Sequence, residues 1–258
     1  MNDKIITLTA PGFEGLQWWL RKLAREGVPP DAREVYRNRR NSIYAVSIDG
    51  QELNIKAFGI PRFPNNYVYT RWRDSKARRS LDNALTLRRL GIETPKPVGA
   101  VEVIENGQLT HSYYVSRQIN ITGDMRDWSS NPEAAAAVPD LAALMVRLHA
   151  QGVFHKDLSA GNIMIKRDRR GRRHLLLIDL NRMEFSVFDH RRQMENFERI
   201  YPESAEETAR LARLYARAAG LDEETTVSEA EAARQHYLRG KARFRTLKRL
   251  LRGKPRKR

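Results

Sequence analysis

The stretch that most constrains this chain is FHKDLSAGNIMI, residues 154–165. It places a carboxylate, Asp157, and an amide, Asn162, five residues apart, directly before a short apolar run. A second apolar run, HLLLI at 174–178, ends in another carboxylate, Asp179. Carboxylate and amide oxygens are ligands that suit Mg²⁺. The three side chains therefore predict a functional site. They lie on the loops directly before and after a predicted β-hairpin over residues 163–178.

The order of these residues is H-x-D-x4-N, then an apolar run and Asp, which is the catalytic-loop and metal-loop arrangement of protein-kinase-like phosphotransferases. In that chemistry Asp157 accepts a hydrogen bond from the acceptor hydroxyl, and Asn162 and Asp179 bind Mg²⁺. His155 is expected to be structural and to hydrogen-bond the backbone near Asp179. Lys156 either leans toward the transferred phosphate or faces solvent. The predicted reaction is phosphoryl transfer, in which positioning and charge neutralisation dominate.

Residue patterns on either side of this loop predict the fold. Alternating apolar and polar residues predict strands over 32–38, 42–48, 53–58, 98–104 and 112–119, with hairpin turns at Asp49-Gly50 and Asn106-Gly107. Helical spacing is found over 11–26, 75–90, 133–149 and 203–219. The predicted fold class is α+β, a bilobal protein-kinase-like fold. Its N-lobe, residues 1–117, has an antiparallel five-stranded sheet with one helix, and its C-lobe, residues 118–258, is mainly helical.

The N-lobe pattern also contains candidate ATP-binding residues. Lys56 lies on the strand at 53–58 and is expected to reach the α- and β-phosphates. Asp82 is the only acidic residue inside the helix at 75–90 and is expected to pair with Lys56, as a Glu does in kinases. Gln118 and Ile119 follow the last strand, where a kinase hinge would hold adenine. The turn at 36–42 stands where kinases have a glycine-rich phosphate loop, but it contains no glycine. Either its arginines assist by charge or it is only a hairpin.

Other residues point away from regulated protein kinases. Leu180-Asn181-Arg182 follows Asp179 in place of Phe-Gly, and no A-P-E sequence follows. Leu158-Ser159 stands where Ser/Thr protein kinases have Leu-Lys. These departures favour a small-molecule kinase or an atypical kinase.

Taken together, the motifs resemble the lipopolysaccharide kinases that phosphorylate Kdo or heptose in the inner core of bacterial lipopolysaccharide. The resemblance spans roughly 34–200 and rests on HKDLxxxNI at 155–163, IDLNR at 178–182, SKARRS at 75–80, GIxTPxP at 91–97 and the NIK strand at 54–56. It implies a bilobal kinase fold, ATP with Mg²⁺ and a sugar hydroxyl of Kdo–lipid A as acceptor. It assigns the catalytic roles to Lys56, Asp157, Asn162 and Asp179. Asp82 departs from the expected Glu.

The charge of the chain indicates a polyanionic partner. The formal net charge is +16, and ten of the eighteen residues from Lys241 to Arg258 are Lys or Arg. Phe244, Leu247, Leu250 and Leu251 recur there at helical spacing, which is typical either of a membrane-surface helix or of a helix docked on the C-lobe. We expect an anionic inner-membrane surface as the partner, and nucleic acid is the less favoured one.

The composition excludes several protein classes. The chain has no cysteine, so it has no disulfide partner. It also lacks a secretory signal pattern and an apolar run of membrane-spanning length. The expected location is cytoplasmic, peripheral at the inner face of the inner membrane.

Two other functions fit part of the pattern. The first is an atypical protein kinase of the RIO-like or Bud32-like groups, which the H-x-D-L-S-x2-N sequence also suits. The second is a basic pseudokinase that binds nucleic acid or membrane without transferring phosphate. The complete set of Lys56, Asp157, Asn162 and Asp179 argues against the second.

Overall fold

The computed structural model describes residues 3–37, 41–60, 74–126, 128 and 130–252. The chain divides into two compact units. The first contains Met1–Asn120 together with Leu176–Arg182, and the second contains Ile121–Leu175 and Met183–Arg258. The segment that contains Asp179 therefore packs with the N-terminal residues, although its neighbours on both sides in the chain belong to the second unit.

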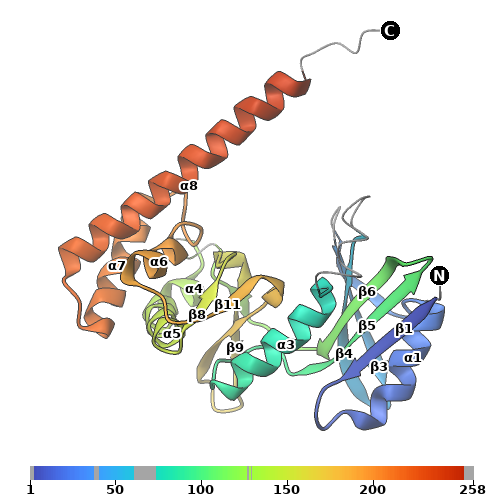
Figure 1. Cartoon of the computed structure of the whole chain (residues 1–258). Helices are drawn as coiled ribbons and strands as arrows, with labels where there is room; N and C mark the ends of the chain where they lie inside the picture. The colour runs from blue at the N-terminus through green and yellow to red at the C-terminus, as the bar shows by residue number, and fades with distance from the viewer. Residues whose placement is uncertain (1–2, 38–40, 61–73, 127, 129, 253–258) are drawn as a thin grey trace. The chain divides into compact units, whose positions relative to one another are not determined.

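The first unit is built on an antiparallel six-stranded sheet of order β1-β5-β6-β4-β3-β2 (Figure 1). Its strands are β1 (Lys4–Thr9), β2 (Arg33–Arg37), β3 (Asn41–Ile48), β4 (Gln51–Phe58), β5 (Pro97–Glu105) and β6 (Gln108–Arg117). The five predicted strands are confirmed, and the strand count is corrected from five to six. The sequence analysis missed β1, which pairs with β5 at the edge of the sheet and ends directly before Ala10.

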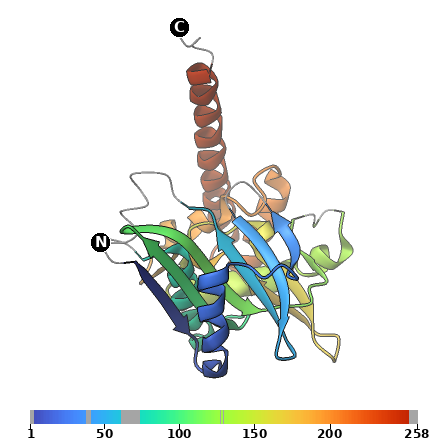
Figure 2. The same cartoon turned by 90° about the vertical axis from the view of Figure 1, so that its right-hand side faces the viewer.

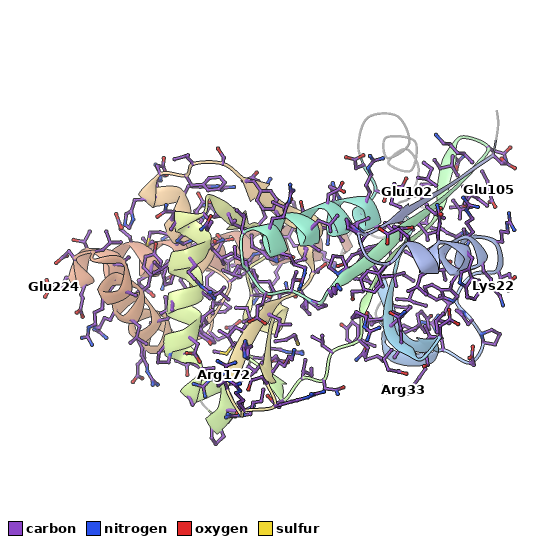
Figure 3. All side chains as sticks on the ribbon, turned by 90° about the horizontal axis from the view of Figure 1, so that it is seen from below. Lys22, Arg33, Glu102, Glu105, Arg172 and Glu224 are labelled. Atoms are coloured by element: carbon purple, nitrogen blue, oxygen red, sulfur yellow. The ribbon has the colours of Figure 1, made fainter. Side chains whose placement is uncertain are left out.

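Two helices pack on opposite faces of this sheet, as Figure 2 shows. Helix α1 (Gln17–Glu26) contacts β1 and β5, and α3 (Lys76–Arg89) contacts β5 and β6. The polar face of α1 includes Lys22, labelled in Figure 3, which lies 3.8 Å from Glu26. Ser75 caps α3, because its Oγ accepts a hydrogen bond from the Arg78 N–H at 3.1 Å. Both helices expected from the spacing at 11–26 and 75–90 are confirmed, and the N-lobe count of one helix is corrected to two.

The two predicted hairpin turns have the backbone that their sequences require. Asp49 and Gly50 have φ values of 49° and 71°, and Asn106 and Gly107 have 52° and 75°. Positive φ at both central residues defines the type I′ turn, which matches the twist of the strands that it joins. These turns set the register of β3 with β4 and of β5 with β6.

The second unit has small sheets and several helices. Its strands are β7 (Gly123–Asp124), β8 (Val153–His155), β9 (Ile163–Arg167), β10 (Arg173–Leu177, whose last two residues belong to the first unit) and β11 (Met183–Phe185). They form one sheet of order β10-β9-β7 and a pair of β11 with β8. Its α-helices are α4 (Pro132–Ala136), α5 (Val138–Ala150), α6 (His190–Met194), α7 (Ala205–Ala219) and α8 (Glu223–Arg252). The predicted hairpin at 163–178 corresponds to β9 and β10.

The helix predicted over 133–149 is two helices. Helix α4 ends at Ala136, and α5 begins at Val138 with Pro139 in its first turn. Because proline has no N–H to donate to the carbonyl four residues earlier, the helix restarts there. Helix α7 lies within the predicted range 203–219, and Ser204 caps it, because its Oγ accepts a hydrogen bond from the Glu207 N–H at 3.2 Å.

Helix α8 is the longest element of the chain, with 30 residues. Its first part packs on α7, α6 and the short helix η4 (Glu195–Phe197), while its basic end runs away from the other helices of the unit (Figure 1). Phe244 and Leu247 are 65% and 55% exposed. Within the described part of the chain, no helix combines the length and the apolar character needed to cross a bilayer.

Two stretches discussed in the sequence analysis are outside the described residues. They are the tip of the glycine-free turn, 38–40, and the last residues of the basic tail, 253–258.

The close approach of β5 to its neighbours predicts a strong effect of substituting Gly99. A Cβ at this position would lie 2.5 Å from Leu8 O and 2.6 Å from Leu20 Cδ1. We expect Gly99→Ala to lower the free energy of unfolding by about 1–3 kcal/mol, the usual cost of overpacking a core. Urea unfolding followed by tryptophan fluorescence measures this, because Trp19 lies beside Leu20. The control is Gly15→Ala, whose Cβ would have no atom within 4 Å, and a loss at Gly99 no larger than the control's would refute the prediction.

Candidate active site

The backbone of the segment Leu176–Arg182 is held by hydrogen bonds to other residues of the first unit. The Leu177 N–H donates to Glu93 O at 3.0 Å, and Thr94 Oγ1 donates to Leu177 O at 2.8 Å. Farther along, Asn83 Nδ2 of α3 donates to Leu180 O at 2.6 Å. Thr94 belongs to the GIxTPxP stretch on which the family resemblance partly rested. The structure gives that residue a physical role, which is to hold the backbone two residues before Asp179.

Lys56 and Asp179 form an ion pair within the first unit. Lys56 Nζ lies 2.5 Å from Asp179 Oδ1, and the two side chains are 14% and 27% exposed. Asn181 Nδ2 donates to the same carboxylate oxygen at 2.6 Å. The fold thus brings together two residues predicted separately from sequence, and it identifies Asn181 as a further residue that orients Asp179.

The backbone of Asp179 is in the left-handed region, with a φ of 58°. Among the described residues it is the one non-glycine residue with positive φ outside the two hairpin turns. Asp tolerates this conformation better than most residues, yet the conformation still costs free energy and is typically retained at functional sites. The hydrogen bonds of Leu177 and Leu180 on either side hold the segment in place.

The predicted pairing of Asp82 with Lys56 is wrong. The Asp82 side chain is 56% exposed and lies 3.9 Å from Arg78 Nε on its own helix. Partial burial is the main cause that raises the pKa of Asp82, and the nearby Arg78 charge opposes the rise. Asp82 is on the outer side of α3, whereas the next residue, Asn83, reaches Leu180. A one-residue step turns a helix by about 100°, which explains why adjacent positions point to different surroundings.

In the second unit, His155 and Asn162 shape the loop that carries Asp157. His155 is fully buried, and its Nδ1 accepts a hydrogen bond from the Asp157 N–H at 3.0 Å. The ring proton is therefore on Nε2. Asn162 Nδ2 donates to Asp157 O at 2.9 Å, which closes the loop from its other end. His155 has the structural role that was predicted, and in this contact its backbone partner is Asp157.

A chain of buried polar groups fixes this loop to the helices beneath it. Asn196 Nδ2 donates to His155 O at 3.0 Å, and Asn196 Oδ1 lies 3.1 Å from His149 Nε2. The other ring nitrogen of His149 lies 2.8 Å from the Tyr215 hydroxyl. These contacts are mutually consistent if His149 is neutral, with its proton on Nε2. Burial lowers the pKa of His149 to about 4, so the ring is neutral near neutral pH.

Lys156 is exposed to solvent, which is one of the two positions considered from sequence. Its ammonium group forms an ion pair with Glu184, although the side chain remains 46% exposed. The hydrogen bond from Lys156 is the main cause that lowers the pKa of Glu184. Arg192 also reaches Glu184, at 3.0 Å. Lys156 therefore links the catalytic-loop stretch to β11, on which Glu184 lies.

Gln118 and Ile119 directly follow β6, as the predicted hinge requires. The Gln118 N–H donates to Glu52 O at 2.9 Å, and Asn54 Nδ2 donates to Gln118 Oε1 at 2.8 Å. Gln118 Nε2 in turn lies 3.2 Å from Ile119 O. These bonds tie the exit from β6 to β4, the strand that carries Lys56.

The sequence did not identify Arg199, which forms an ion pair with Asp157 from 42 positions farther along the chain. Arg199 also borders a polar cavity of about 230 Å³ in the second unit, whose lining includes Lys156, Arg192, Glu195 and Glu198. No short motif surrounds Arg199, so only the fold reveals its contact with the catalytic-loop carboxylate.

Comparison with solved structures defines the class of fold. The chain is similar to a structure described as WaaP in complex with acyl carrier protein, with a TM-score of 0.58 and 18% identity, over 91% of this chain and 99% of the other. It is also similar to the Rio2 kinase–ADP/Mg²⁺-phosphoaspartate complex from Chaetomium thermophilum, with a TM-score of 0.51 and 18% identity, over 90% and 78% of the two chains. The protein therefore has the predicted mixed α+β, protein-kinase-like fold.

Sequence comparison then identifies the family. The lipopolysaccharide kinase (Kdo/WaaP) family profile matches residues 59–215, which include Asp157, Asn162 and Asp179. The chain belongs to this family. No curated protein sequence matches it significantly.

The buried His149 predicts a loss of stability at mildly acidic pH. An unfolded His binds a proton below a pKa of about 6.5, whereas the folded pKa is lowered to about 4. Because the unfolded state binds more protons between these values, stability falls as the pH is lowered through this window. We expect His149 alone to remove about 2 kcal/mol of unfolding free energy between about pH 7 and about pH 5.

Urea unfolding at several pH values measures this effect. His149→Gln should lower stability at neutral pH but show a smaller loss on acidification, because it lacks the titrating group. His111→Gln is the control, since His111 is exposed, and it should keep the wild-type pH dependence. An unchanged pH dependence in His149→Gln would count against the assignment.

Proposed function

We propose that this protein is an ATP-dependent kinase that transfers the γ-phosphate to a sugar hydroxyl, of Kdo or heptose, in the inner core of lipopolysaccharide. The observation that carries the proposal is the family match, because its range contains Asp157, Asn162 and Asp179. Lys56 lies just outside that range, yet it forms an ion pair with Asp179. The acceptor would be the Kdo–lipid A precursor.

The proposed roles of the residues follow from their surroundings. Asp157 accepts a hydrogen bond from the acceptor hydroxyl and orients it, since its backbone is fixed at both ends by His155 and Asn162. Lys56 binds the α- and β-phosphates of ATP from β4. Gln118 and Ile119 hold the adenine with backbone groups at the exit from β6. Asp82 keeps no part in this scheme.

The chemistry of two side chains fits a Mg²⁺ ion. Asn162 uses its Nδ2 to hold Asp157 O, which leaves Oδ1 without a hydrogen bond among the described residues. Asp179 supplies a carboxylate whose orientation is set by Lys56 and Asn181. Oxygen ligands of these two kinds suit Mg²⁺, which would neutralise phosphate charge during transfer. Asn162 and Asp179 are therefore the proposed ligands.

The family match favours a sugar lipid over a protein as the acceptor. The likeness to Rio2 kinase concerns the fold alone, because the identity is 18%. Phosphorylation of a protein substrate is accordingly not a second proposal.

The test is phosphate transfer from ATP to Kdo–lipid A in the presence of Mg²⁺. We expect Asp157→Asn to lower kcat by about 10²- to 10⁴-fold, because the amide cannot accept the hydroxyl proton as a carboxylate can. Asp222→Asn is the matched control, since Asp222 caps α8 through the Thr225 N–H and Asn caps equally well. Wild-type protein that transfers no phosphate to the sugar lipid, or Asp157→Asn that remains fully active, would overturn the proposal.

We further propose that the basic end of α8 binds the anionic inner face of the inner membrane. Residues 242–248 are exposed, and they combine apolar Phe244 and Leu247 with Arg243, Arg245 and Lys248. A helix with these two kinds of side chain inserts its apolar residues at the interface while its cations attract lipid phosphates. Nucleic acid would use the cations alone.

Vesicle sedimentation tests this membrane contact. Truncation after Ala242 removes nine Lys or Arg residues but keeps Lys241, which pairs with Glu203 at 3.0 Å. We expect the truncated protein to lose binding to vesicles of phosphatidylethanolamine with phosphatidylglycerol, and the full chain to bind more weakly at high salt. Phe244→Ser with Leu247→Ser keeps every charge and should lose the salt-resistant part of the binding. Equal binding by full and truncated chains would refute the contact.

A further inference from the structure

Arg199 is the charged partner of the proposed catalytic carboxylate. Its Nη1 forms an ion pair with Asp157 Oδ1, and the two side chains are 30% and 27% exposed. Both residues belong to the second unit. Arg199 follows the short helix η4, which also supplies Asn196 to the buried hydrogen bonds beneath the loop. One stretch of chain therefore holds both the backbone and the carboxylate of the catalytic loop.

The guanidinium of Arg199 is itself held by two neighbours. Its Nε is buried without a hydrogen bond and lies 3.4 Å from Glu198 Oε1. Its central carbon lies 5.0 Å from the centre of the Tyr237 ring. A cation over an aromatic face is attracted by the electrons of the ring. Tyr237 thus restrains Arg199 through the face of its ring, and its hydroxyl makes no hydrogen bond within the described residues.

Tyr237 connects this contact to the long helix. It lies on α8, one turn before Lys241, whose Nζ is 5.9 Å from the centre of the same ring and 3.0 Å from Glu203. The exposed basic end of α8 begins directly after these residues. The series Asp157, Arg199, Tyr237 and Lys241 is therefore a continuous path of contacts inside one unit, from the catalytic loop to the helix that carries the basic end.

We propose that Arg199 is a positioning residue for Asp157, and that Tyr237 keeps Arg199 in place so that the seating of α8 sets the activity of the catalytic loop. The inference rests on the proposed kinase function. A carboxylate that orients a hydroxyl must be fixed in direction, and a displacement of about 1 Å can cost about 100-fold in rate. The Arg199 guanidinium contacts Asp157 Oδ1 and so restricts the direction of that oxygen.

The test compares two pairs of variants in the Kdo–lipid A assay. Arg199→Met should lower kcat about 10- to 100-fold with little change in KM for ATP, because the change affects the acceptor-side carboxylate. Arg199→Lys should recover part of that loss, since it keeps the charge without the planar donor group. Tyr237→Leu should lower kcat about 3- to 10-fold, and Tyr237→Phe, which keeps the ring, should match the wild type.

The outcomes separate this inference from the proposed function. An active wild type with an equally active Arg199→Met variant overturns the inference and leaves the kinase proposal intact. Equal rates for Tyr237→Leu and Tyr237→Phe overturn the α8 connection. If the wild type transfers no phosphate, the kinase proposal fails, and amide hydrogen exchange of residues 155–163 then tests whether Tyr237 restrains the loop that carries Asp157. Faster exchange in Tyr237→Leu than in Tyr237→Phe supports this restraint, and equal exchange refutes it.

Discussion

The ion pair between Lys56 and Asp179 joins residues 123 positions apart and connects the Leu176–Arg182 segment to β4 of the first unit. Asp179 can reach Lys56 because Thr94, Glu93 and Asn83 bind the backbone on either side of it. In kinases a helix glutamate normally pairs with the strand lysine. Here Asp179 forms the ion pair with the strand lysine, and Asp82 is 56% exposed. Partly buried polar contacts of this kind fix one geometry, because leaving either partner unpaired is costly.

In the second unit, the backbone and the side chain of Asp157 are held by two separate sets of contacts. Neutral His149, Asn196 and buried His155 form a hydrogen-bonded chain that leads from the helices to the backbone of Asp157. The side chain of Asp157 is held separately by Arg199. The backbone and the carboxylate of Asp157 are thus constrained by different residues, so a substitution can loosen one without the other. Because of this separation, kinetics can distinguish a positioning role of Arg199 from a purely structural one.

The positive charge of the protein is organised in two ways. In the body of the second unit, cations such as Lys156, Arg192 and Arg199 are paired with carboxylates, which limits their attraction to outside anions. At the end of α8 no acidic residue follows Lys241, and the described side chains from 242 to 248 are exposed. Positive charge without acidic neighbours in the sequence is therefore concentrated where the helix leaves the rest of its unit, and it lies next to apolar side chains that suit an interface.

The sequence by itself determined the local features. These are the alternation of the strands, the Asp-Gly and Asn-Gly turns and the spacing of Asp157, Asn162 and Asp179. Neighbours in the chain set each of them, so a linear pattern reveals them. The edge strand β1 was missed because its pairing with β5 is a long-range contact. The partner of Lys56, the role of Thr94 and the contact of Arg199 with Asp157 were likewise decided only by tertiary structure. Each depends on side-chain direction and distance between remote segments, which no local pattern specifies.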